Sequence, residues 1–85
     1  MSFFASIYSD NLLSARAKSV YMYLCDRSDN ERKCWPGIKR ISLDLHMSRS
    51  TVKRAIADLE RHGYLHRAPR YRDNGSRSSN LYTLK

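Results

Sequence analysis

The residues best suited to chemistry in this 85-residue chain are cations at helical spacing between positions 49 and 61. When this stretch is wound at about 100° per residue, Val52, Ala55, Ile56 and Leu59 cluster on one face. The opposite face carries small residues between long cationic ones, and its members are Ser50, Arg54, Ala57 and Arg61, with Arg49 and Lys53 flanking them. Such a helix can bury its apolar side while its cationic side contacts base edges and phosphates in a major groove.

Solubility alone also produces charged helix faces, and this interpretation competes with the first. Here few acids compensate the cations, because Asp58 and Glu60 lie toward the sides of the outward face. Ser48 is expected to cap the helix by accepting from the N–H of Ser50 or Thr51, and the helix start adds a positive dipole end. The pattern therefore favours a polyanionic partner on this face.

The charge of the whole chain supports such a partner. Its formal net charge is +8, from 16 Lys and Arg residues against 8 Asp and Glu residues, which indicates nucleic acid or an anionic membrane. No apolar run approaches the ~18 residues that a membrane span needs. Residues 1–10 lack the basic start and small-residue cleavage site of a signal peptide. We therefore expect a cytoplasmic protein that binds nucleic acid and not a membrane.

Catalytic, cofactor and metal sites are not expected in this chain. The sequence shows no nucleophile–base arrangement, no paired carboxylates and no phosphate-binding glycine loop. Cys25, Cys34, His46 and His62 lack the short spacings of zinc ligands. The two cysteines suit a reducing compartment, with a disulfide between them as the less favoured alternative. We predict a protein that is not an enzyme and that needs no cofactor, metal or small-molecule ligand.

Hydrophobic periodicity predicts the elements that must position the cationic helix. They are a helix over 14–27, a short strand over 33–35, helices over 38–46 and 49–62, and strands over 64–72 and 77–84. Ser14 is expected to cap the first helix, and Gly63 to end the third in the left-handed conformation. The Asn74-Gly75 step favours a tight hairpin turn between the last two strands. Trp35 is expected to cover the core beside the short strand.

The predicted hairpin carries a second basic cluster. It contains Arg67, Arg70, Arg72 and Arg77, and only Asp73 opposes them. An Arg-rich hairpin tip suits a phosphate backbone or a narrow minor groove. Protection of an edge strand against aggregation explains the same charges, and both explanations can hold together.

The run from Pro36 to Leu65 resembles the core of bacterial winged helix-turn-helix DNA-binding domains. Its most specific piece is Ser48-Arg49-Ser50-Thr51-Val52-Lys53-Arg54-Ala55-Ile56, followed by Leu59 and Gly63-Tyr64-Leu65. The resemblance spans roughly 12–84 and is strongest to small regulators and to the DNA-binding modules of plasmid and phage replication initiators. It implies an α+β winged helix-turn-helix fold, with a three-helix core, a short strand and a C-terminal β-hairpin as the wing.

Two positions depart from the family pattern. His46 stands in the turn where the family usually has Gly, and Gly37 caps the second helix where it usually has Ser or Thr. Histidine tolerates the left-handed region better than most residues, so the turn can survive. Neither departure removes a residue that the resemblance assigns to DNA. Those residues are Arg49, Ser50, Thr51, Lys53 and Arg54.

The sequence therefore predicts one domain over 1–85, with a core over 12–84, that binds double-stranded DNA in transcription regulation or replication initiation. A recognition helix at about 49–62 would enter the major groove, and a wing at about 69–79 would contact the backbone or minor groove. The predicted DNA-binding residues are Arg49, Ser50, Thr51, Lys53, Arg54, Ala57, Arg61, Arg70, Arg72 and Arg77. The alternatives are a protein-interaction module and a binder of RNA or single strands. The extension over 1–11 is apolar enough to dock on a second subunit of a homodimer, or equally to cover its own core.

Overall fold

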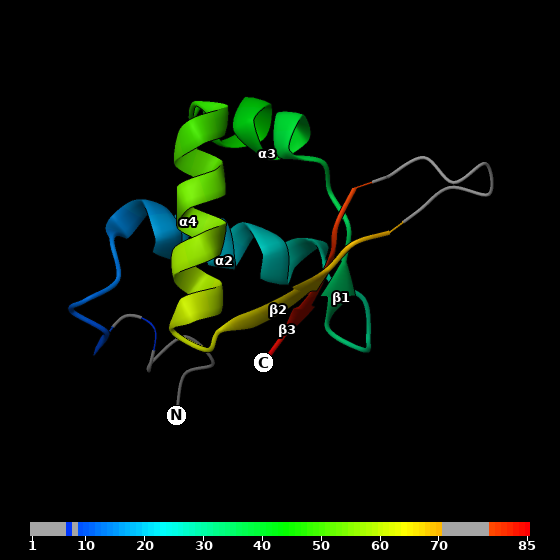
Figure 1. The fold of residues 1–85 in the computed structure, drawn as a ribbon, viewed down its shortest axis with the longest axis horizontal. Helices are drawn as coiled ribbons and strands as arrows, with labels where there is room; N and C mark the ends of the chain where they lie inside the picture. The colour runs from blue at the N-terminus through cyan, green and yellow to red at the C-terminus, as the bar shows by residue number, and fades with distance from the viewer. Residues whose placement is uncertain (1–6, 8, 71–78) are drawn as a thin grey trace.

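The computed structural model describes residues 7, 9–70 and 79–85. Within these residues the named helices and strands are α2 (Ala15–Arg27), β1 (Lys33–Cys34), α3 (Ile38–Leu45), α4 (Arg49–Arg61), β2 (Leu65–Ala68) and β3 (Leu81–Leu84). Helix α4 crosses α2, α3 lies at the N-terminal end of α4, and the small sheet lies beside them (Figure 1). This order and packing confirm the predicted winged helix architecture.

Serine caps set the starts of the two longest of these helices. The Ser14 Oγ accepts a hydrogen bond from the Ala17 N–H at 3.1 Å, and α2 begins at the next residue. The Ser48 Oγ accepts from the Thr51 N–H at 3.1 Å, and α4 likewise begins one residue later. Both predicted caps are confirmed, and Thr51 is the partner that Ser48 uses.

Left-handed residues end α3 and follow α4. His46 closes α3 at φ 55° and ψ 42°, with its N–H directed to the Ser42 carbonyl. Gly63 follows α4 at φ 83°. Because the Cβ atom of an L-residue disfavours this region, the tolerance of histidine for it matters at the turn of the helix-turn-helix. The expected geometry at both positions is confirmed.

The three strands form an antiparallel sheet in the order β1-β3-β2. Cys34 pairs with Tyr82 on one side of β3, and Ala68 pairs with Leu81 on the other. Strand β2 is shorter than the predicted 64–72, because Pro69 follows Ala68 and has no N–H for the ladder. Strand β3 begins at Leu81, and most of the predicted wing (71–78) lies outside the described residues.

The core fills the space between α2, α4 and the sheet. Its fully buried members include Val20, Leu24, Ile56 and Tyr82, each no more than 1% exposed. Ile7 belongs to the same cluster at 1% exposure, so the segment before residue 12 contributes to the core of its own chain.

Trp35 lies outside this core, and the prediction that it covers the core is wrong. Its exposed fraction is 50%, whereas its neighbour Cys34 is only 3% exposed. Side chains alternate between the two faces of a strand, so the inward position of Cys34 turns the next residue outward. The guanidinium of Arg70 lies over the Trp35 ring, 5.1 Å from its centroid.

Candidate nucleic-acid interface

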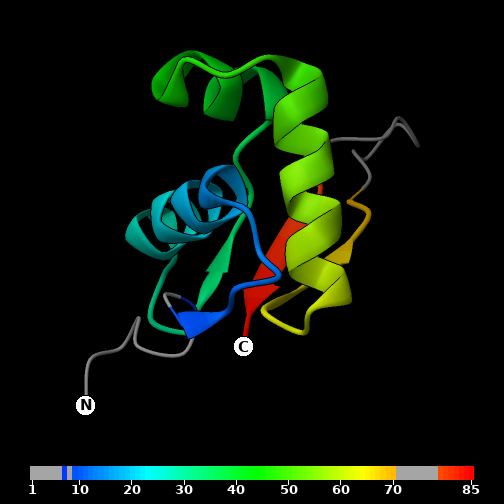
Figure 2. The same cartoon turned by 90° about the vertical axis from the view of Figure 1, so that its left-hand side faces the viewer.

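Helix α4 has one buried side and one open side. Val52, Ala55, Ile56 and Leu59 are buried against α2 and the sheet. Arg49, Ser50, Lys53, Arg54 and Arg61 are exposed, while Thr51 and Ala57 are half-buried. Figure 2 shows α4 upright, with α2 packed along its left side. The division of faces that the spacing predicted is therefore the one observed.

The acids of α4 are occupied by cations at its C-terminal end. Asp58 pairs with Arg61, and Glu60 accepts from the Nε of Arg67 at 3.1 Å. In contrast, Arg49, Lys53 and Arg54 have no acidic partner within 4.0 Å in the described part of the chain. The positive charge that is not compensated therefore gathers on the N-terminal half of the open face.

On one side, the open face of α4 meets the N-terminus of α3 and the start of β3. Lys53 borders a pocket of about 290 Å³ there, together with Pro36, Gly37, Ile38, Ser79, Asn80 and Tyr82. Lys53 is thus directed toward the base of the predicted wing. Tertiary packing brings these three segments together although Pro36 and Tyr82 are 46 residues apart in sequence.

On the other side, α4 meets the N-terminus of α2, and this contact adds a residue that sequence reasoning missed. Arg16 and Ser14 line a pocket of about 170 Å³ with Thr51, Arg54, Ala55 and Asp58. Arg16 is exposed and has no ion pair with another described residue. Its position beside Arg54 depends on how α2 packs on α4, which no local pattern reports.

The predicted wing residues divide into those placed and those not. Arg70 is exposed and stacked on Trp35, whereas Arg72 and Arg77 lie outside the described residues. Arg67 bonds to Glu60 with its backbone N–H as well as its side chain, at 3.3 and 3.1 Å. This pair ties β2 to the last turn of α4, so Arg67 is held at the junction of helix and sheet.

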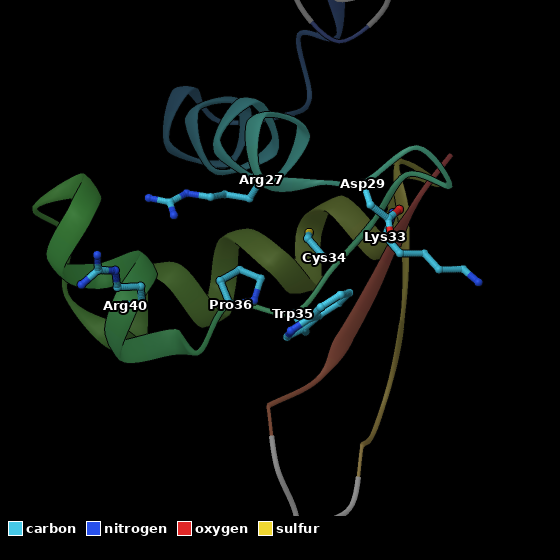
Figure 3. A pocket seen from close by; sticks show the side chains of 7 residues that line it. All are labelled: Arg27, Asp29, Lys33, Cys34, Trp35, Pro36 and Arg40. Carbon is cyan, nitrogen blue, oxygen red and sulfur yellow. The ribbon is translucent and has the colours of Figure 1, made fainter.

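A further pocket lies on a different side of the sheet, between α2, β1 and α3 (Figure 3). Its three cations are Arg27, Lys33 and Arg40. Arg27 and Arg40 share Asp44 at 3.0 and 3.4 Å, and Lys33 pairs with Glu31 at 3.2 Å. The Asp29 Oδ1 accepts the backbone N–H groups of residues 31 and 33 at 2.9 and 3.0 Å. Carboxylates match the cations here, so we do not assign this pocket to a polyanion.

The described cysteines show no sign of reactive chemistry. Burial raises the pKa of Cys34 to about 11, and burial also raises the pKa of Cys25. Both are free thiols, and a protonated buried thiol is a poor nucleophile and metal ligand. Among the residues that the structure describes, no three His, Cys, Asp or Glu side chains gather as a metal site would require. No helix of the described ranges is long and apolar enough to cross a membrane.

Comparison with known proteins gives this arrangement a family. Residues 11–65 match a family model described as a helix-turn-helix domain. Protein YmfN of Escherichia coli (strain K12) is 43% identical over 58 residues, which are 68% of this chain but only 13% of YmfN. A solved structure described as a possible transcriptional regulator from Methanosarcina mazei Go1 superposes with a TM-score of 0.68 at 22% identity, over 87% of this chain and 57% of that one. The likeness to this solved structure concerns the fold alone. Because the family model matches more than half of the chain, this chain belongs to the helix-turn-helix domain family, in the winged form.

Proposed function

We propose that this domain binds double-stranded DNA, with α4 in the major groove and the wing on the backbone or in the minor groove, in transcription regulation or replication initiation. The observation that carries the proposal is the open face of α4, where Arg49, Lys53 and Arg54 have no acidic partner in the described chain. Its opposite face is locked into the core. A helix held in this way can enter a groove without giving up core contacts.

Each outward residue of α4 suits a distinct contact. Arg54 lies near the centre of the open face and can donate two hydrogen bonds to a guanine edge. Lys53 points toward the wing side and suits a phosphate. Ser50 and Thr51 stand in the first turn, where the positive end of the helix dipole favours anionic oxygens. Ala57 is small enough to let the helix approach closely.

Arg61 can join this interface only by exchanging its partner. It pairs with Asp58 at the exposed C-terminal end of α4, where its side chain is 71% exposed. Exposed ion pairs of this kind are worth about 0–1 kcal/mol, so a phosphate can compete with the carboxylate. We therefore assign Arg61 a peripheral contact and place the centre of recognition at Arg54.

The test is the affinity of the protein for a duplex and for its separated strands, measured by fluorescence anisotropy for wild type, Arg54→Ala and Arg27→Ala. We expect preference for the duplex and a loss of about 1–3 kcal/mol in Arg54→Ala if the side chain contacts a base. Arg27 carries the same charge but pairs with Asp44 away from α4, so its variant should bind almost as wild type. Equal binding by all three proteins, or preference for the single strand, would overturn the proposal.

A further inference from the structure

Trp35 is one of three large hydrophobic side chains that are exposed in the described structure, and it is the one aromatic residue among them. Half of its surface is open, although it is the single tryptophan of the chain and lies between a strand and a helix. It directly follows β1 and precedes Pro36, which restricts its backbone to extended conformations. The backbone position of Trp35 is therefore restricted, while its exposed ring can contact a side chain outside the core.

That partner is Arg70, which comes from the opposite edge of the sheet. Arg70 follows β2 by two residues, and β3 lies between β1 and β2. The stacking of the Arg70 guanidinium on the Trp35 ring, at 5.1 Å, therefore bridges the outer strands across β3. It does so at the end of the sheet where the predicted wing begins.

The start of β3, the other strand beside the predicted wing, lies near the same β1–α3 connection (residues 35–37). A Cβ built on Gly37 would lie 3.4 Å from the Oγ of Ser79, so the backbone at Gly37 runs close to the entrance of β3. Gly37 is also the N-cap of α3, the first helix of the helix-turn-helix. The segment 35–37 thus lies beside both described ends of the wing, with Trp35 against Arg70 and Gly37 near Ser79.

We propose that Trp35 is a positioning residue for DNA binding: by stacking on Arg70 it fixes this arginine, at the end of β2, relative to α3 and α4. The inference rests on the proposed function, because it assigns the wing a contact with the same duplex. Trp35 itself does not touch DNA in this account. Its ring holds Arg70, and Arg70 in turn contacts the duplex beside the groove that α4 enters.

The experiment measures duplex affinity for Trp35→Ala, Trp35→Phe, Arg70→Ala, Arg70→Lys and the double variant Trp35→Ala/Arg70→Ala. Cation–π pairs at exposed sites correspond to about 2- to 5-fold in an equilibrium constant, so Trp35→Ala should lose about that much affinity. Trp35→Phe should restore most of it, and the double variant should bind no more weakly than Arg70→Ala. Arg70→Lys keeps the charge but loses the planar stack, so it should weaken binding.

A matched control lies elsewhere on the molecule. Arg27 lies over the Tyr23 ring with its guanidinium 5.0 Å from the ring centroid, at nearly the same distance but within α2. Arg27→Ala removes the same charge and the same kind of contact, so it should affect DNA binding less than Arg70→Ala. Trp35 fluorescence gives a second readout, because acrylamide should quench it more strongly in Arg70→Ala than in wild type or Arg27→Ala.

The outcomes separate this inference from the function on which it rests. If Lys53→Ala and Arg54→Ala lose duplex binding while Trp35→Ala keeps it at full strength, the positioning role is wrong and DNA binding by α4 stands. Additive losses in the double variant would also overturn the positioning role, because independent sites add and coupled ones do not. If no variant changes the affinity, the proposed function fails as well.

Discussion

Ser48 controls the start of the helix that carries the proposed interface. Its Oγ accepts from the Thr51 N–H at 3.1 Å and lies 2.8 Å from the Thr51 Oγ1, so one side chain satisfies a free donor of the first turn. The same turn holds Arg49 and Ser50, which are proposed to face DNA. At the scale of single residues, Ser48 therefore both starts α4 and positions the residues of its first turn that are proposed to face DNA.

Replacing Ser48 with Ala should lower the free energy of unfolding by about 1 kcal/mol, because the first turn loses its acceptor. Urea denaturation measures this loss. Ser50→Ala is the matched control, since Ser50 is exposed and does not cap the helix. Equal stabilities of the two variants would contradict the role given to Ser48.

His46 is the second residue on which the helix-turn-helix depends. Its φ of 55° is a conformation that costs L-residues about 1–2 kcal/mol, and β-branched residues suffer most. His46→Gly should therefore keep or raise the thermal stability, whereas His46→Val should lower it. A melting temperature that falls for glycine and stays constant for valine would show that the turn does not need this geometry.

At the scale of elements, Asp44 links α2 to α3. Its Oδ2 accepts from the Tyr23 Oη at 2.6 Å and pairs with Arg27 and Arg40. The hydrogen bond from Tyr23 and the exposed pair with Arg27 join the first helix of the helix-turn-helix to the longer α2, whereas the pair with Arg40 lies within α3. The hydrogen bond from Tyr23 is the main cause that lowers the pKa of Asp44 below its ordinary 3.8, and the two guanidinium groups add to it.

A lowered pKa in the folded state means that the contribution of Asp44 to stability is complete above the unfolded value of 3.8. The contribution is lost as the pH falls through the folded value. The free energy of unfolding of wild type should therefore decrease on acidification below about pH 4. Asp44→Asn should flatten this decrease in urea titrations at successive pH values. If the free energy of unfolding falls with pH in the same way for both proteins, Asp44 does not contribute to the acid dependence of stability.

Elements fixed by local patterns could be predicted from the sequence, and contacts between distant segments could not. The bounds of α4 followed from Ser48, from an apolar stripe at helical spacing and from Gly63. The outward position of Trp35 depends on which residue of β1 faces the core, and that depends on pairing of Cys34 with Tyr82, 48 residues away. The place of Arg16 beside Arg54 depends on packing of α2 against α4 for the same reason.

At the scale of the whole molecule, the net charge of +8 is unevenly matched. The cations in the pocket of Figure 3 face carboxylates, whereas those in the N-terminal half of α4 do not. Uneven charge of this kind steers a polyanion to one side of a protein. The described structure therefore predicts both where DNA approaches and which cations should change its salt dependence.

Duplex affinity should fall as salt rises, and each phosphate contact should add about 0.9 to the slope of log affinity against log salt concentration. Lys53→Ala should lower the magnitude of this slope by about that amount, because Lys53 is proposed to contact a phosphate. Lys33→Ala is the control of equal charge change, since Lys33 pairs with Glu31 at 3.2 Å away from α4. Titrations at several salt concentrations measure both slopes. A larger change for Lys33→Ala than for Lys53→Ala would mean that DNA contacts the side of Lys33 and would contradict the interface on α4.

The most direct test of the central claim is selection of bound sites from a random duplex library by wild type and by Arg54→Ala. If α4 is the recognition helix, wild type should enrich a defined motif, and its symmetry would report whether two copies bind together. The variant should lose preference at the one or two base pairs that Arg54 contacts and retain the rest. An identical motif from both proteins, or no enrichment by wild type, would contradict the account.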